Sequence, residues 1–420
     1  MNMKEDIILE NVNNPDKLEE IYHKNPSKFK GIIDKLYEIY PEQILFRFWK
    51  IRLNYKNNYK IKLFSDKATL LYFMLTFILS IIYFNIGSFI NIPEEFLYNR
   101  NLSFIIIVPI IFYLRLQKKF IWEKSILLII PILIQLTYVN ILPSVPNSDV
   151  LNWVWIYSPV LLWYMILVSF VNFDLKNYEK ILEFLRLNGN VLVLNTIILI
   201  SGLLFNGIVS TLFYASGFAQ IDLISSYVNG ILIPLGAMTP LITVHIVTKN
   251  PNLVNKIPSL IAFIFTPLVI VIFAIYIIMA LFGMMNFGEN RELLIILNAL
   301  LIAVMAIIIF LISNLQHKFK TLYLKLVLIM IIETIIINII GLVMIFYRVM
   351  EGFTPNRTNI IVINLMVFVH LISIAYIILK ILFKKINIQN INTVIARQIP
   401  FYVIWFIIVV YIFPFLFNFE

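Results

Sequence analysis

Apolar segments of membrane-spanning length follow one another from Ala68 to the end of the chain. A helix needs about 20 residues to cross roughly 30 Å of hydrocarbon. The chain is 61% hydrophobic and 13% charged, whereas soluble proteins are roughly 45–50% apolar and about 25% charged, so an ordinary water-soluble protein is excluded. We predict an all-α polytopic transmembrane bundle of about eleven spans, near residues 68–90, 101–114, 125–142, 151–171, 191–214, 226–248, 258–282, 293–315, 322–347, 358–383 and 399–418.

The distribution of Lys and Arg between the loops supports this count. With the N-terminus inside, 29 of the 33 basic residues fall on the cytoplasmic side, and the outer side carries only Arg100, Arg291, Arg348 and Arg357. Cytoplasmic loops retain basic residues, so the asymmetry predicts an N-in, C-out protein with the lipid bilayer as its main partner. The heavy use of Ile, Lys and Asn is typical of an AT-rich bacterial genome, so we expect a bacterial cytoplasmic (inner) membrane. The same retention explains the net charge of +10 without nucleic-acid binding.

Residues 1–67 differ from the rest of the chain because they hold 13 basic and 10 acidic residues and no apolar run of spanning length. Two Asn-Pro pairs, beginning at Asn14 and Asn25, place an N-cap residue before a proline at the first helical position. We therefore predict two domains, a small cytoplasmic helical head over 1–67 and a transmembrane helical domain over 68–420.

The last helix predicted in the head, Pro41–Tyr55, mixes large aromatic residues with Arg and Lys. This mixture suits a helix that lies against the inner leaflet. A helical hairpin docked on the membrane domain is the alternative interpretation. In either case the head is a candidate site for a cytoplasmic protein partner.

The connection from Asn172 to Asn190 has a helical pattern of its own. Its apolar residues fall on one face and its charged residues on the others, and Gly189 follows as a helix stop. We predict an amphipathic helix at the interface, separate from the span that follows it. A solvated linker helix is the alternative.

Glu333 is the acidic residue that the span assignment leaves inside the bilayer. A carboxylate there costs roughly 2.5–3.5 kcal/mol on insertion scales, so it must face the protein interior or a water-filled path. His370 lies at a similar depth in the next span, which runs antiparallel to the first. The two residues are our candidates for a proton relay or cation site, and a neutral hydrogen-bonded pair that fixes helix packing is the alternative.

The sixth predicted span contains Asn229, Pro234, Gly236 and Pro240 within twelve residues. Prolines six apart remove backbone donors and bend or break a helix. Broken helices at membrane depth are found where the backbone is buried in protein or lines a cavity, as in many transporters. We therefore predict a broken-helix region here, with a kinked packing interface as the alternative.

Aromatic residues gather in the fourth predicted span, and we interpret them as an interfacial belt rather than a ligand cage; they are Trp153, Trp155, Tyr157, Trp163 and Tyr164. The sequence contains no HExxH, Walker A, GxGxxG or GxSxG motif with triad partners. It has no cysteine, and its four histidines are scattered. We therefore predict no catalytic residue, metal site or cofactor, and no enzyme.

The loop before the tenth span reads Glu351-Gly-Phe-Thr354-Pro355-Asn356-Arg357, and the final span contains Pro400 and Trp405. Over about the last 75 residues the chain resembles an uncharacterised bacterial family of polytopic membrane proteins grouped under a domain of unknown function. The resemblance implies a multi-pass fold and no known activity.

The physical role of this outer-loop motif can be predicted from its residues. Thr354 can cap the tenth helix, and Pro355 suits the first helical position. Arg357 near a helix N-terminus is unfavourable by dipole, so we expect an anionic partner for it: Glu351, a lipid head group or a ligand.

The lone carboxylate, the facing histidine and the proline-rich span together favour movement of a small solute or ion, possibly coupled to protons. The alternative is a non-transporting sensor, scaffold or assembly factor whose head binds a partner. A water-accessible cavity that reaches Glu333 would favour transport, and a dry bundle with exposed apolar surface on the head would favour the alternative.

Overall fold

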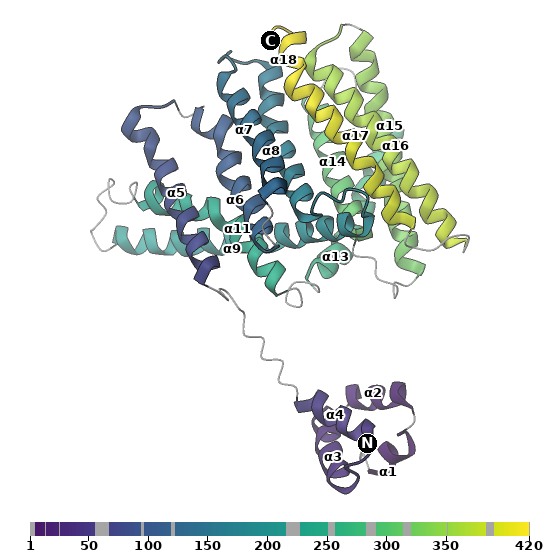
Figure 1. The fold of residues 1–420 in the computed structure, drawn as a ribbon. Helices are drawn as coiled ribbons and strands as arrows, with labels where there is room; N and C mark the ends of the chain where they lie inside the picture. The colour runs from purple at the N-terminus through teal and green to yellow at the C-terminus, as the bar shows by residue number, and fades with distance from the viewer. Residues whose placement is uncertain are drawn as a thin grey trace. The chain divides into compact units, whose positions relative to one another are not determined.

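The computed structural model describes residues 5–12, 14–24, 26–54, 67–93, 96–118, 122–215, 227–250, 257–282, 291–313, 321–350, 352–383 and 390–419. The chain divides into two compact units, Met1–Ile61 and Lys62–Glu420. In the residues just given the secondary structure is helical and contains no strand, which confirms the all-α class (Figure 1).

The first unit contains four short helices, α1 (Glu5–Glu10), α2 (Pro15–Lys24), α3 (Pro26–Ile39) and α4 (Ile44–Asn54). Asn14 caps α2 as its sequence position predicts, since its side chain accepts from the Lys17 N–H at 3.2 Å. A small core forms where Phe29 of α3 and Trp49 of α4 meet edge to face at 4.8 Å. The aromatic Trp49 is therefore buried inside the head.

The second unit contains the apolar helices. Within the described residues, nine helices are long and apolar enough to cross a membrane, and two further apolar stretches, Thr266–Leu281 and Leu297–Ser313, are shorter. A multi-pass membrane domain follows from these lengths. The helices are α5 (Lys67–Ile90), α6 (Leu102–Leu116), α7 (Trp122–Ile141), α8 (Asp149–Phe170), α9 (Tyr178–Ala215), α11 (Ile233–Lys249), α13 (Ile257–Leu281), α14 (Arg291–Ser313), α15 (Thr321–Met350), α16 (Pro355–Leu382), α17 (Asn390–Tyr411) and α18 (Phe413–Leu416).

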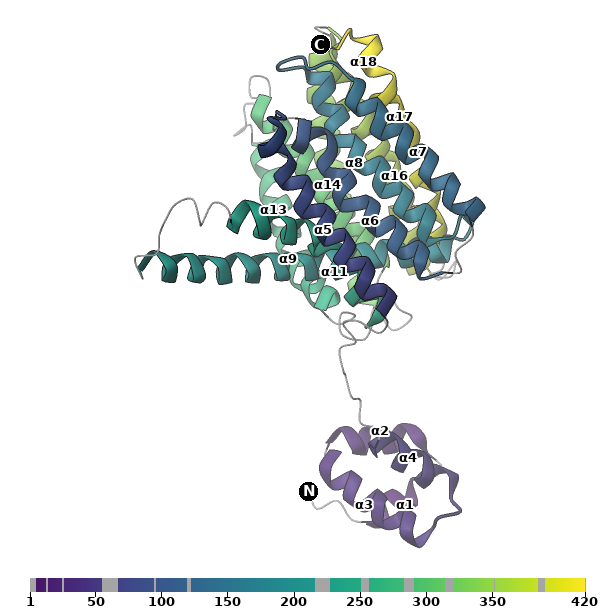
Figure 2. The same cartoon turned by 60° about the vertical axis from the view of Figure 1, so that its left-hand side comes forward.

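Helix α9 differs from the prediction for its region. The expected amphipathic helix and the span after it form one continuous helix of 38 residues, and Gly189 does not end it. A Cβ at Gly189 would lie 2.0 Å from the Phe310 ring of α14, so glycine here permits close helix contact rather than a stop. Figures 1 and 2 both show α9 running across the direction of α6, α7 and α8.

The predicted interruption of the sixth span is a π-helical turn, Val228–Leu232, that leads directly into α11. Pro234 lies in the first turn of α11, where a missing N–H is tolerated. Pro240 lies inside the helix and leaves the Gly236 carbonyl without its N–H donor. The Thr239 hydroxyl donates to that carbonyl at 2.8 Å, so α11 continues through the proline instead of breaking.

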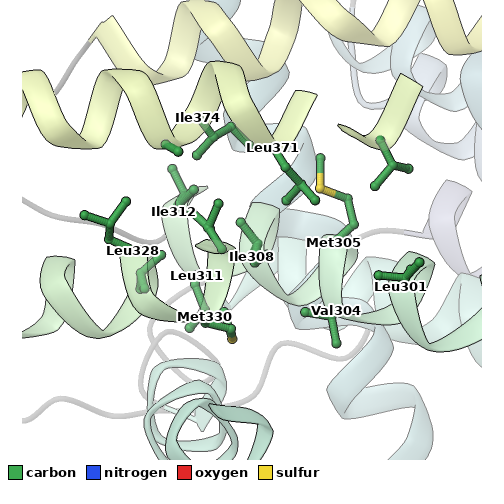
Figure 3. Packing of buried hydrophobic residues seen from close by; sticks show 14 of the residues in the cluster. Leu301, Val304, Met305, Ile308, Leu311, Ile312, Leu328, Met330, Leu371 and Ile374 are labelled. Carbon is green, nitrogen blue, oxygen red and sulfur yellow. The ribbon is translucent and has the colours of Figure 1, made fainter. Parts of the chain in front are cut away.

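Buried side chains form two large clusters in the membrane domain. One lies mainly among α5, α6, α7, α8 and α11, and the other among α13, α14, α15, α16 and α17. In the second cluster, Ile308 and Ile312 of α14 lie toward Leu371 and Ile374 of α16 (Figure 3). Helices α8 and α17 also pack on each other and connect the two groups through a third cluster. The space between these groups contains the candidate site.

Candidate functional site

A cavity of about 430 Å³ lies between α8, α14, α16 and α17; we call it the central cavity. Its wall is almost entirely apolar. Ile156 of α8 and Ile302 of α14 belong to this wall and are 52% and 53% exposed, so the cavity is not closed off. Such a space suits a molecule that is soluble in hydrocarbon.

Aromatic rings form much of the wall of the central cavity. Tyr157 stacks on Phe406 with ring centroids 4.6 Å apart, and Tyr402 lies beside Phe406. The indole N–H of Trp163 donates to Asn188 at 2.9 Å, so the polar tip of this ring is satisfied. Tyr164 completes the α8 side. Helix α8 therefore turns several of its aromatic residues inward, whereas the sequence indicated an interfacial belt.

His370 brings a nitrogen-bearing side chain to this apolar wall. It is 1% exposed, and its Nδ1 lies 3.4 Å from the Tyr402 hydroxyl. Its Nε2 is buried and has no hydrogen-bond partner in the described part of the chain. A buried ring nitrogen without a partner costs free energy, so it is a natural contact for a polar group on a bound molecule.

A second cavity of about 460 Å³ lies at the end of the bundle where α16 begins; we call it the polar cavity. Its lining includes Asp149, Asn298, Arg348 and Arg357. Thr354 borders it and caps α16 as predicted, with its side chain accepting from the Arg357 N–H at 3.3 Å. The outer-loop motif therefore lies at a site with several hydrogen-bond donors.

A layer of hydrogen-bonded side chains lies between the two cavities. The Trp153 indole N–H donates to Asn356 at 2.5 Å, and the Trp405 indole N–H donates to Asn359 at 2.9 Å. The Asn359 amide also donates to the Tyr157 hydroxyl at 2.9 Å. These bonds hold α8 and α17 against the first turns of α16.

The structure does not join the two residues predicted to act as a relay. No hydrogen bond or ion pair between Glu333 and His370 occurs in the described residues, which include both. Glu333 lies in α15, half-buried, with its Oε2 buried and without a partner, and it lines neither the central nor the polar cavity. His370 instead faces the central cavity. A role for Glu333 in proton movement stays a prediction.

The other predicted residues lie elsewhere or outside the described atoms. Pro234, Gly236 and Pro240 lie in α11 and line neither cavity, and the Ser80 hydroxyl of α5 donates to the Pro234 carbonyl at 3.3 Å. The Asn229 side chain and the whole of Glu351 fall outside the described residues. The ion pairs predicted for Glu351 therefore also fall outside them.

Two functional features were missed in the sequence. One is the inward-facing aromatic wall of α8. The other is the series Asn356, Asn359 and Asn364 in the first three turns of α16, where amides are costly in lipid. The Asn364 amide donates to Asn298 at 2.7 Å, so this series contacts three other helices. Three asparagines within the first three turns of an apolar helix were the feature of the sequence that could have revealed this series.

The opposite end of the bundle carries two basic residues, a buried arginine and a half-buried lysine. Arg115 at the end of α6 is fully buried, donates to Asn172 at 2.7 Å, and leaves Nε and Nη2 without partners in the described region. Lys118 donates to the carbonyls of Ser169 and Phe170. Burial, followed by the nearby charge of Lys180, lowers the pKa of Lys118. These contacts tie the end of α6 to the end of α8.

Comparison with protein-family models, curated proteins and solved structures finds no match to this chain.

Proposed function

We propose that this protein is a multi-pass membrane transporter that binds a small, largely apolar organic molecule in the central cavity and moves it. The observation that carries the proposal is the Nε2 of His370, which is buried and has no partner among the described residues, in the wall of an apolar space of about 430 Å³. Binding sites for small molecules are typically about 300–1,000 Å³, mostly apolar, with few polar groups that fix orientation. His370 and the Tyr402 hydroxyl supply those groups.

The exposed parts of the cavity wall favour access from the bilayer. Ile156 and Ile302 lie on this open side. An apolar molecule concentrates in hydrocarbon and reaches such an opening without leaving it. The proposal therefore favours a substrate of the lipid phase over a hydrated ion.

Labelling with an alkyl diazirine tests this site in phosphatidylcholine nanodiscs. Ala306 of α14 lines the central cavity, so Ala306→Phe fills it and should reduce labelling of α14 and α16 peptides several-fold. Ala303 is an exposed residue on the same helix and lines neither cavity, so Ala303→Phe should leave labelling unchanged. Equal labelling of wild type and Ala306→Phe would refute the proposal.

Proton coupling is the finer part of this proposal. His370 in the wall of the central cavity supports it. Glu333 lines neither the central nor the polar cavity, so its part in the coupling rests on its position as a carboxylate inside the membrane domain. In liposomes that carry an internal pH dye, Glu333→Gln should abolish pH-dependent movement of the probe and leave folding intact. An unchanged pH profile would show that Glu333 takes no part.

A second candidate function is a non-transporting sensor, scaffold or assembly factor. Ile44, Phe48 and Ile51 of α4 are exposed apolar residues on the head, which favours a docked cytoplasmic protein. Binding of the alkyl probe without movement, together with loss of cellular activity in Phe48→Glu, would favour this candidate. Movement of the probe by the reconstituted chain alone would favour transport.

The eleven-span, N-in, C-out arrangement in a bacterial inner membrane is also proposed. Lys249 at the end of α11 donates to Gln117 beside the end of α6, and α9 begins after the end of α8. We infer that the α9–α11 pair starts and ends on the same side of the membrane. The unusual direction of α9, across the neighbouring helices, then leaves an odd number of spans odd. Reporter tags at the two termini should be accessible from opposite compartments.

A further inference from the structure

The central and polar cavities are neighbours along three helices, and Ile302 belongs to the lining of both. On α8, Trp153 lines the polar cavity and Tyr157 the central one. On α16, Asn356 lines the polar cavity and Ile363 lines the central cavity. Ile302 of α14 lines both cavities. The stretch of α8 from Asp149 to Tyr164 covers about 22 Å at 1.5 Å per residue. A molecule that occupied both spaces would have to pass Ile302.

The described lining of the polar cavity has more positive than negative side chains. It contains two arginines, Arg348 and Arg357, and one carboxylate, Asp149. Asp149 forms no ion pair with either arginine in the described residues. The side chain of Arg348 has no hydrogen bond or ion pair in that region either. Guanidinium groups bind phosphate and carboxylate with paired hydrogen bonds, so this lining suits an anion.

A buried amide points to the same ligand chemistry. Asn298 is 9% exposed and lines the polar cavity, and its Oδ1 accepts from Asn364. Its Nδ2 has no partner in the described chain and remains an unused donor. The N-terminus of the 28-residue helix α16 also borders the cavity, and helix N-termini favour negative charge. The described lining therefore combines the unpartnered Asn298 amide with the N-terminus of a long helix and two guanidinium groups, and Asp149 is the carboxylate among these residues.

We infer that the polar cavity binds the anionic head group, a phosphate or carboxylate, of an amphiphile whose apolar chain lies in the central cavity. This inference rests on the proposed function and specifies its substrate class. The apolar chain is held by the aromatic wall, and the charged end is held by Arg348, Arg357 and the Asn298 amide. Arg357 also donates to the Gly352 carbonyl at 3.1 Å, so the anion would lie beside a guanidinium group that already has a backbone contact.

The test uses two photoreactive probes with the same alkyl diazirine chain, one ending in phosphate and one in hydroxyl. In phosphatidylcholine nanodiscs, wild type should reach half-maximal labelling at about tenfold lower concentration with the phosphate probe. Arg348→Gln should remove this difference and leave hydroxyl-probe labelling unchanged, which also shows that the variant is folded. Arg348→Lys should retain part of the difference.

Arg397→Gln is the matched control, because Arg397 is an exposed arginine of α17 that lines neither cavity. It should behave as wild type with both probes. Competition by phosphatidic acid would identify the head group as that of a lipid, and competition by single-chain alkyl phosphate alone would identify a soluble amphiphile; both results support the inference. Equal competition by inorganic phosphate would overturn the joint use of the two cavities.

The two proposals fail in different ways. Equal wild-type affinity for both probes, with labelling still sensitive to Ala306→Phe, would overturn the head-group site and leave the central cavity as a binding site. Labelling that is insensitive to Ala306→Phe would overturn the proposed function itself. A phosphate preference that survives Arg348→Gln would also overturn the head-group assignment.

Discussion

Replacement of Asn359 by leucine should weaken the junction of α8, α16 and α17. Asn359 is 1% exposed, accepts from the Trp405 indole at 2.9 Å, and exchanges hydrogen bonds with the Tyr157 hydroxyl. Leucine has a similar size, so packing is largely kept while two buried polar groups lose their partners. Each such loss costs about 1–3 kcal/mol in water-soluble proteins and roughly 0.6–2 kcal/mol between membrane helices. We expect a total loss of about 2–3 kcal/mol in the free energy of unfolding.

The assay is reversible unfolding by sodium dodecyl sulfate in mixed micelles, followed by circular dichroism. Ser373→Ala is the control, because the exposed Ser373 hydroxyl donates within α16 to the Val369 carbonyl and joins no second helix. Its effect should stay within about 0.5 kcal/mol. A double-mutant cycle with Tyr157→Phe should give a coupling free energy of about 1 kcal/mol. The reasoning is refuted if Asn359→Leu costs no more than Ser373→Ala, or if the coupling is zero.

Four further variants test two contacts that set the helix arrangement. Gly189→Ala should lower the free energy of unfolding by about 1–3 kcal/mol, because the added methyl group would meet the Phe310 ring. Gly202 lies on the same helix with open space around it, so Gly202→Ala should raise the free energy of unfolding by about 0.5–1 kcal/mol. Equal effects of the two substitutions in the same unfolding assay would contradict the close approach of α9 and α14. Arg115→Met should raise the midpoint of thermal unfolding, since it removes a buried charge with two unpartnered nitrogens. Asn172 has a backbone φ of 57°, which glycine adopts easily, so Asn172→Gly should not strain the backbone. The substitution removes the side-chain oxygen that accepts from Arg115 and should therefore lower the free energy of unfolding by about 2 kcal/mol. A stabilising effect of Asn172→Gly would contradict this account.

Hydropathy and local capping explain what could be predicted from the sequence. Backbone groups in hydrocarbon must form hydrogen bonds within their own segment, so long apolar runs determine helices regardless of their neighbours. The caps at Asn14 and Thr354 depend on side-chain and backbone atoms three residues apart, and both formed as expected. These features are local, which is why one sequence was enough to find them.

The partners of buried polar groups were decided by tertiary structure. His370 lies beside Tyr402 and not Glu333, because the rotation of each helix about its axis and the order of helices in the bundle determine which side chains meet. Arg100 was assigned to an outer loop, yet it is buried and donates to the Val139 and Leu142 carbonyls at the end of α7. Neither contact has a signature in residue spacing.

The amino-acid order therefore determined that this chain is helical, apolar and capped at particular residues, since those properties arise within a few turns of one helix. The long α9 and the path shared by α8, α14 and α16 depend on packing between segments far apart in the chain. A glycine such as Gly189 can end a helix, or it can let another helix pack closely against its backbone. The sequence does not distinguish these two roles, and the position of the Phe310 ring of α14 in the folded protein shows that Gly189 has the second one.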